Sequence, residues 1–293
     1  MSKFTFSGHE TFHCRHFWLK KGYDFLIDGN KFNQDDAVVK LGVGKNMVAS
    51  IRFWLKAFDL INEDETPSYF AQYLFGENGK DPYLEDPASL WLLHYMLIRK
   101  EYSSIYALVF DDFLKTRNEF TREHLLNFIK RKASEHYSNN QNDLNDKTLL
   151  KDINVFLKNY VMPKRKVKNI EEDFVGLMID LNLIHILRES HADKDIWFKI
   201  ENRNSDNIPS EIILFALLDQ LKESSTVELN RLLNDKKNIG LVFVLNSNSL
   251  VNHIQAITKK YPELIFTEDA GIRVVQIKKQ IDKWDILNRY YAS

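Results

Sequence analysis

The chain has 293 residues, enough for about two compact domains, and it carries 40 Lys and Arg against 41 Asp and Glu. A formal net charge of −1 gives the whole molecule almost no attraction for phosphate, so a nucleic-acid surface has to come from a local arrangement of basic residues. Hydrophobic residues make up 44% of the chain and charged residues 28%, which excludes a disordered or fibrous protein. The low content of Gly and Pro favours helices joined by short loops.

The single cysteine, Cys14, excludes an intrachain disulfide and a metal site built from several cysteines. The sequence contains no apolar run of the length that a signal peptide or a membrane-spanning helix needs. We therefore expect a cytoplasmic protein that does not enter a membrane.

The first motif lies near the amino end, where His9, Glu10 and His13 match the HExxH pattern. On a helix this spacing places two imidazoles on one face to bind zinc, with the glutamate as a base. The match is weak because zinc peptidases of this kind build a sheet before the helix, and only eight residues precede His9. A structural interpretation competes with it, since Ser7 and Glu10 have the spacing of a capping box. That interpretation does not explain His9, His13 and Arg15, so the segment stays a candidate for chemistry.

A helix-turn-helix pattern follows. Asn33 is the expected cap of a helix over 35–41, glycines at 42 and 44 break it, and a second helix runs from Lys45 to about Leu60. A period of 3.6 residues places large apolar side chains on one face of the second helix, namely Met47, Ile51, Trp54, Phe58 and Ile61. The opposite face carries small and basic side chains. The candidate DNA contacts of this helix are Lys45, Asn46, Ala49, Ser50, Arg52 and Lys56. The alternative is a solvated face on a protein-packing unit.

Three carboxylates, Asp81, Glu85 and Asp86, lie close together before a predicted helix over 87–98. Clustered carboxylates are ligands that Mg²⁺ prefers, and Mg²⁺ activates water for phosphodiester cleavage. The alternative is structural, with Asp86 as the N-cap of the helix and Pro87 as its first residue.

The middle of the chain is predicted to contain helices over 122–133, 148–160 and 171–186 and a strand over 196–200. Polar stretches at 134–147 and 201–209 are predicted as connections. A basic loop between the helices offers contacts to a phosphate backbone, or is simply solvated. Its candidate residues are Lys164, Arg165 and Lys166.

The last part of the chain predicts a helix over 210–223, a short strand over 225–227, a helix from 228 and a helix over 249–261. Two strands over 263–267 and 272–278 then form a hairpin. This is the element order of a winged helix. The outward face of the 249–261 helix carries candidate DNA contacts that fit solvent equally well, namely Asn252, Gln255 and Lys259.

These patterns predict a mainly α fold with small β-hairpins and several helix-turn-helix or winged-helix units. We expect an N-terminal helix-turn-helix domain over 1–133, a helical middle segment with the basic loop over 134–208, and a winged-helix domain over 209–293.

Five motifs in the first hundred residues resemble a bacterial family first catalogued as a domain of unknown function, whose members lie beside genes of DNA phosphorothioation clusters. The motifs are the segments 6–12, 18–22, 41–48, 51–54, and 81–86 together with 90–94. The resemblance implies a nicking step that lets sulfur replace a non-bridging phosphate oxygen. It also implies a cysteine desulfurase and an ATP-using protein as partners.

The residue patterns and the resemblance both indicate double-stranded DNA. We expect a DNA-binding component of a phosphorothioation system that acts as a Mg²⁺-dependent nicking endonuclease, and a homodimer is compatible with the sequence. The candidate catalytic residues are His9, Glu10, His13, Arg15, Glu85 and Asp86. The alternative is a non-catalytic DNA-docking adaptor or a transcriptional regulator.

Overall fold

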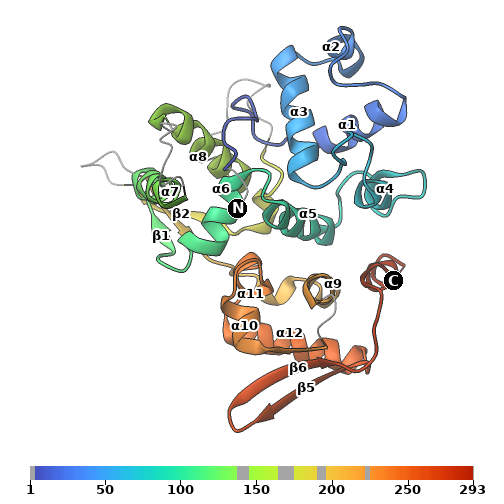
Figure 1. Ribbon diagram of the computed structural model, residues 1–293, viewed down its shortest axis with the longest axis vertical. Coiled ribbons are helices and arrows are strands. Elements are labelled where there is room, and N and C mark those ends of the chain that lie inside the picture. The colour runs from blue at the N-terminus through green and yellow to red at the C-terminus, as the bar shows by residue number, and fades with distance from the viewer. Residues whose placement is uncertain (1–3, 137–144, 164–174, 190–195, 222–224, 293) are drawn as a thin grey trace.

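The computed structural model describes residues 4–136, 145–163, 175–189, 196–221 and 225–292, and its first part is built from helices (Figure 1). Local signals set the ends of these helices. Ser68 accepts a hydrogen bond from the Ala71 N–H at the start of one helix, and Gly42 ends another in the left-handed conformation. The helices are α1 (Trp18–Ile27), α2 (Ala37–Leu41), α3 (Lys45–Ala57), α4 (Tyr69–Phe75) and α5 (Pro87–Lys100).

The second part continues with helical elements and confirms the two helices predicted at 122–133 and 148–160. The polar connection predicted over 134–147 is shorter, because Ser134 belongs to one of these helices and Asp146 to the other. Residues 137–144 lie outside the described part. The elements are α6 (Ser104–Ala107), the π-helical turn η1 (Leu108–Phe113), α7 (Arg122–His136) and α8 (Asp146–Tyr160).

A three-stranded antiparallel sheet joins this part, and it corrects the helix predicted over 171–186. Its strands are β1 (Glu119–Phe120), β3 (Ile196–Ile200) and β2 (Ile184–Glu189), in that order, and the 3₁₀ turn η2 (Ile179–Leu181) precedes β2. Asn182 takes the left-handed conformation, which stops a helix, and Ile184 then pairs with Ile200. The predicted strand over 196–200 is confirmed.

The last part forms a unit at the lower end of the molecule in Figure 1, and it contains the predicted elements in order with two further helices, over 239–242 and 283–290. A 3₁₀ turn, η3 (Ser205–Asn207), lies in the polar connection before it. Its sheet has the antiparallel order β4-β6-β5, and a turn at Ala270 and Gly271 closes the hairpin. The elements are α9 (Ser210–Leu221), β4 (Thr226–Glu228), α10 (Leu229–Asn234), α11 (Ile239–Val242), α12 (Ser247–Lys260), β5 (Leu264–Asp269), β6 (Ile272–Ile277) and α13 (Lys283–Tyr290).

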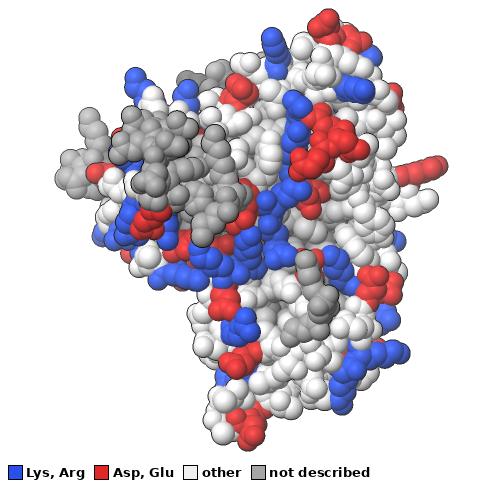
Figure 2. Space-filling view, viewed as in Figure 1, with Lys and Arg blue, Asp and Glu red and all other residues white. Residues whose placement is uncertain are grey.

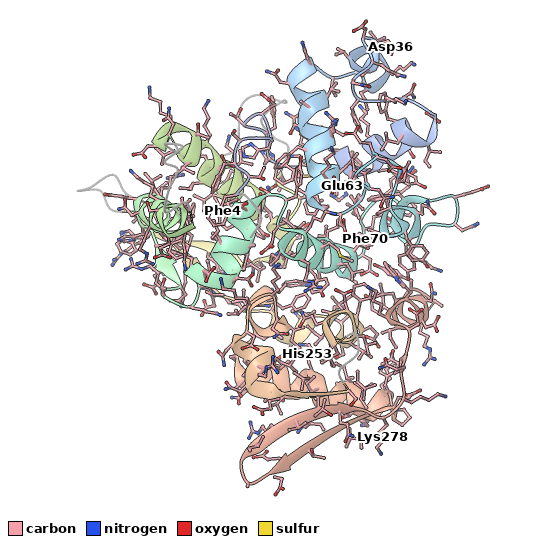
Figure 3. The ribbon with its side chains drawn as sticks, viewed as in Figure 1. Phe4, Asp36, Glu63, Phe70, His253 and Lys278 are labelled. Carbon is pink, nitrogen blue, oxygen red and sulfur yellow. The ribbon has the colours of Figure 1, made fainter. Side chains whose placement is uncertain are left out.

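Helix α13 returns from this C-terminal unit to the first part of the chain. Its Trp284 ring lies 4.7 Å from the Tyr69 ring and 5.2 Å from the Phe215 ring, so it touches both α4 and α9. Phe70, labelled in Figure 3, lies on the same helix as Tyr69 and also contacts Trp284. Aromatic packing of this kind buries a large area and fixes the C-terminal unit against α4.

A buried histidine, His94, links all three parts of the chain. Its Nδ1 lies 2.8 Å from the Tyr160 hydroxyl of α8, and its Nε2 donates to the carbonyl of Val242 in α11 at 2.7 Å. Burial lowers the pKa of the His94 imidazole to about 4, so the ring is neutral at pH 7. One neutral side chain of the first segment thus satisfies polar groups from the two other segments in the centre of the molecule.

The predicted fold class is confirmed in its main feature, since the molecule is mainly α with two small antiparallel sheets. Apolar side chains from all three predicted segments belong to one continuous buried cluster. Among the described residues, none of the helices combines the length and the apolar composition that crossing a bilayer requires.

The π-helical turn η1 carries a buried carboxyl, Asp111. It accepts a hydrogen bond of 2.6 Å from the backbone N–H of Lys237, which joins η1 to the loop before α11. Burial raises the pKa of the Asp111 carboxyl from an ordinary value of 3.8 to about 6. The folded chain therefore binds this proton more tightly than the unfolded chain does.

Asp111→Asn tests this assignment. The favourable contribution of Asp111 to folding is fully present below about pH 4 and is lost as the pH rises through about 6, because the ionised carboxyl is buried. We expect the Asn variant to gain about 2–3 kcal/mol of unfolding free energy relative to wild type between pH 4 and pH 7.5. Urea unfolding of both proteins at several pH values measures the difference, and a difference that does not change with pH would contradict the assignment.

Candidate nucleic-acid interface

Helix α3 is held by its apolar face, as the sequence predicts. Ile51, Trp54 and Phe58 are fully buried, and α1 packs closely on this face because Gly22 has no Cβ to collide with Ile51 and Leu55. Lys45, the first residue of α3, follows the bend formed by Gly42 and Gly44. The helix-turn-helix pattern therefore sets the position of α3, whose predicted end at about Leu60 is three residues too late.

The outward face of α3 is exposed at its N-terminal half. Lys45, Asn46 and Ala49 all face solvent. Ser50 is fully buried, so its prediction as a DNA contact is wrong. The physical reason is the helical period, since Ser50 lies three residues after Met47 and four before Trp54, on the core side.

The C-terminal half of this face is covered by a carboxylate that helix periodicity does not reveal. Glu65, in the loop after α3, pairs with Arg52 and with the Lys56 ammonium at 2.9 Å. Partial burial raises the pKa of the Glu65 carboxyl, but hydrogen bonds from both basic groups outweigh it and hold that pKa below its usual range. Figure 2 shows acidic side chains beside basic ones in the region of α3. The carboxylate-free face predicted from the sequence is thus restricted to the first two turns.

The N-terminal motif is not a metal-binding helix. Residues 7–12 form turns in which Ser7, Glu10 and Thr11 have positive φ, so both the HExxH helix and the capping box at Ser7 are wrong. His9 is 1% exposed, and its Nε2 lies 2.9 Å from the Asp152 carboxylate, which also accepts the Ser7 N–H. A buried, partnered imidazole does not reach a substrate, which corrects the prediction that His9 is catalytic.

The other candidates of this motif lie nearer the surface. Glu10 is exposed, and His13 and Arg15 are half-buried. The Arg15 guanidinium lies 5.0 Å from the centre of the Trp18 ring, in a cation–π contact.

Two of the three carboxylates near residue 85, Asp81 and Asp86, have structural roles. Asp81 accepts the backbone N–H groups of Glu85 and Asp86 at 2.9 and 3.0 Å. Asp86 caps α5 by accepting the Ala88 N–H, as the structural alternative predicts, and also accepts the Tyr290 hydroxyl. Glu85 alone of the three is exposed.

The chain just after the first motif contacts this turn, since His16 Nε2 lies 2.7 Å from the Tyr83 carbonyl. The contact does not create a metal centre. Across the described ranges, no group of three or more His, Cys, Asp or Glu side chains is arranged to hold an ion.

The second predicted contact surface lies on α12 of the C-terminal unit. Leu250, Ile254 and Ile257 are buried, while the opposite face exposes Asn252, Gln255 and Lys259, as predicted. His253, labelled in Figure 3, is buried beside this face, and its Nε2 donates a hydrogen bond to the Ser205 carbonyl at 2.8 Å. The candidate residues of the basic loop, Lys164, Arg165 and Lys166, lie outside the described residues.

A basic pocket that the sequence prediction missed lies between the end of α5 and the C-terminal unit. It has a volume of about 280 Å³, and its basic residues are Arg99, Arg231, Lys236 and Lys237. Figure 2 shows Lys and Arg gathered across the middle of this face. Each of the four pairs with a carboxylate, such as Asp112 with Lys236 at 2.7 Å and Glu101 with Lys237 at 2.8 Å. The adjacent lysines 236 and 237 are visible in the sequence as a small basic cluster. The sequence does not show that the fold brings them together with Arg99 and Arg231.

A family model described as "Protein of unknown function (DUF4007)" matches residues 6–291. The chain belongs to this DUF4007 family. Two solved structures, an SspB crystal structure and a magnesium ion-bound SspB crystal structure, each superpose with a TM-score of 0.84 at 27% sequence identity. Each match covers 98% of this chain and 88% of the other chain. No curated protein sequence matches the chain.

The motifs that carry the resemblance to the DUF4007 family mostly hold the fold together. Gly8 lies against the Phe53 ring, where a Cβ would overlap ring atoms, and His9 stacks on Trp54 with ring centres 6.1 Å apart. The glycine and the histidine of the first motif therefore fit against the second helix of the helix-turn-helix pattern. Tight packing of this kind explains why these residue types occur together.

Asp152→Ala tests the structural role of the first motif. The change leaves the buried His9 ring and the Ser7 N–H without their acceptor, so we expect a loss of about 3 kcal/mol in unfolding free energy. Asp146→Ala on the same helix is the matched control, because within the described residues the one ion pair of Asp146 is a surface pair with Lys130, whose loss costs about 1 kcal/mol or less. Denaturant unfolding measures both, and equal effects would show that the buried pair does not hold the segment.

Proposed function

We propose that this DUF4007 protein is a DNA-binding component of a DNA phosphorothioation system. The observation that carries the proposal is the match to SspB structures over 98% of the chain, together with motifs that resemble a family linked to phosphorothioation clusters. The partners that this resemblance implies, a cysteine desulfurase and an ATP-using protein, are part of the proposal.

Two exposed helical faces support DNA contact. On α3 the first two turns offer Lys45, Asn46 and Ala49 beside the glycine bend. In the C-terminal unit, the order of helix, strand, helices and hairpin around the β4-β6-β5 sheet supports a winged-helix interpretation, in which we infer that α12 acts as the recognition helix. The exposed amides of α12 are groups that bind base edges or phosphates.

Strand nicking is the second candidate function, favoured by the match to a magnesium ion-bound SspB structure. A Mg²⁺ site needs several oxygen ligands around one point. The described residues do not fit a preformed site, because Asp81 and Asp86 use carboxylate oxygens to hold backbone N–H groups and Glu10 and Glu85 stand apart as exposed side chains. We therefore assign no step of a cleavage reaction to a bound metal.

Glu65→Gln tests the DNA-binding proposal at α3. The change releases Arg52 and Lys56 for phosphates, so we expect affinity for a duplex to rise about three- to tenfold, with a steeper salt dependence. Fluorescence anisotropy with a labelled duplex, measured across a range of salt concentrations, gives both quantities.

Glu63→Gln is the matched control, because it removes the same charge from the same loop. Glu63, labelled in Figure 3, is exposed and forms no ion pair within the described part of the chain. If both variants strengthen binding equally, the pair of basic residues on α3 does not contact DNA. If the wild-type protein does not bind a duplex, the proposed function fails.

A plasmid assay separates the nicking enzyme from a non-catalytic adaptor or regulator. For the enzyme we expect Mg²⁺-dependent conversion of supercoiled DNA to open circles, reduced at least about tenfold in Glu10→Ala or Glu85→Ala with duplex affinity unchanged. Glu77→Ala, another exposed glutamate, is the control. Duplex binding without any conversion would assign the protein to the adaptor class.

A further inference from the structure

A groove of about 650 Å³ lies where the C-terminal unit meets the middle of the chain, and we call it the junction groove. The loop after η1 and the end of β3 form one side, and α10, α11 and the start of α12 form the other. Buried aliphatic residues such as Leu241 and Leu245 form its floor. The polar residues that line it are Lys115, Thr116, Arg117, Asn118, Glu201, Asn202, Arg203, Asn234, Asn246 and Ser247.

The junction groove differs from α3 and from the basic pocket in the pairing of its basic residues. Arg52 and Lys56 of α3 and the four basic residues of the pocket are paired with carboxylates. Lys115 and Arg117 are exposed and have no ion-pair partner within the described part of the chain. Glu201 is the one carboxylate among the described residues of the lining, and it already pairs with Arg203 at 2.8 Å and with Lys199 at 3.2 Å. Hydrogen bonds from these two basic residues hold the pKa of the Glu201 carboxyl below its usual range. Two basic groups are therefore left for an anionic ligand.

The groove also contains the beginning of α12. Asn246 caps this helix by accepting the Ser249 N–H at 2.9 Å, and Ser247 is its first residue. The partial positive charge of a helix N-terminus attracts phosphate and adds to the field of the two basic residues. Along the same helix, the exposed face continues from Asn248 to Asn252, so the groove and the outward face of α12 form one continuous surface.

We propose that the junction groove binds the phosphodiester backbone of one DNA strand while the outward face of α12 lies against the duplex. This proposal rests on the DNA-binding function proposed above. Phosphates in protein–DNA complexes are held by Lys and Arg, by Ser, Thr and Asn side chains, and by helix N-termini, and the groove combines all of these. An acidic protein partner fits less well, because protein interfaces centre on aromatic and large apolar side chains, which in this groove form only the floor.

The test is a charge reversal on the loop after η1. We expect the double change Lys115→Glu and Arg117→Glu to weaken duplex binding at least tenfold and to reduce the slope of log affinity against log salt by about 2, since each phosphate contact contributes roughly 0.9. Both side chains are exposed, so thermal unfolding should match wild type. Lys151→Glu, at an exposed lysine of α8 outside the groove, is the matched control and should change affinity less than twofold.

A second variant locates the strand directly. Cys14 is fully buried, so a thiol-reactive photo-crosslinker on Thr116→Cys labels the groove, and we expect it to crosslink to the duplex. If the wild-type protein binds DNA and the double variant binds it equally well, the assignment of the groove is wrong, but the proposed function still stands. Loss of binding to labelled polyglutamate, with duplex binding unchanged, would also overturn it and make the groove a site for acidic proteins. A wild-type chain that binds no duplex would defeat the proposed function itself.

Discussion

The buried imidazole of His94 is the constraint on which the arrangement of the molecule depends. It lies on α5 at the centre and bonds to Tyr160 of the middle segment and to Val242 of the C-terminal unit. Both ring nitrogens are occupied, and burial keeps the ring neutral at pH 7. Replacing it by an apolar side chain would leave a buried hydroxyl and a buried carbonyl unpaired, which costs more than a lost surface contact. The three segments are therefore fixed relative to one another, and surfaces formed between them, including the junction groove, have a defined shape.

A second constraint fixes the N-terminal segment. This segment has little regular structure, and the backbone at Ser7, Glu10 and Thr11 is left-handed, a conformation that needs support from its surroundings. Asp152 supplies that support by accepting both the Ser7 N–H and the His9 ring. Reactive side chains that are close together in the sequence therefore act mainly as structural anchors here.

Much of the fold could be predicted from the sequence, because amphipathic helices and a hairpin are local patterns. The period of α3 correctly placed Ile51 and Trp54 in the core. The helix predicted over 171–186 was wrong because β2 pairs with β3, and this strand pairing overrides the local preference for a helix. The pairing of Glu65 with α3 was missed because Glu65 lies in a loop that folds back on this helix. Helical periodicity describes only the residues of the helix itself. The partner of His9 lies 143 residues away on α8 and left no local signal.

The distribution of charge bears on the proposal that a nearly neutral chain binds DNA. The four basic side chains of the basic pocket are already paired, as Lys236 is with Asp112, and such a pair must be broken before its cation binds a phosphate. Net charge therefore says little about where a binding surface lies. The proposed surface instead rests on Lys115 and Arg117, which have no ion-pair partner among the described residues. Because this surface also depends on the junction that His94 holds together, the proposal implies that affinity for DNA is coupled to the packing of the C-terminal unit. A local sequence pattern does not predict that coupling, because the residues that line the groove come from loops and helix ends that include positions more than a hundred residues apart.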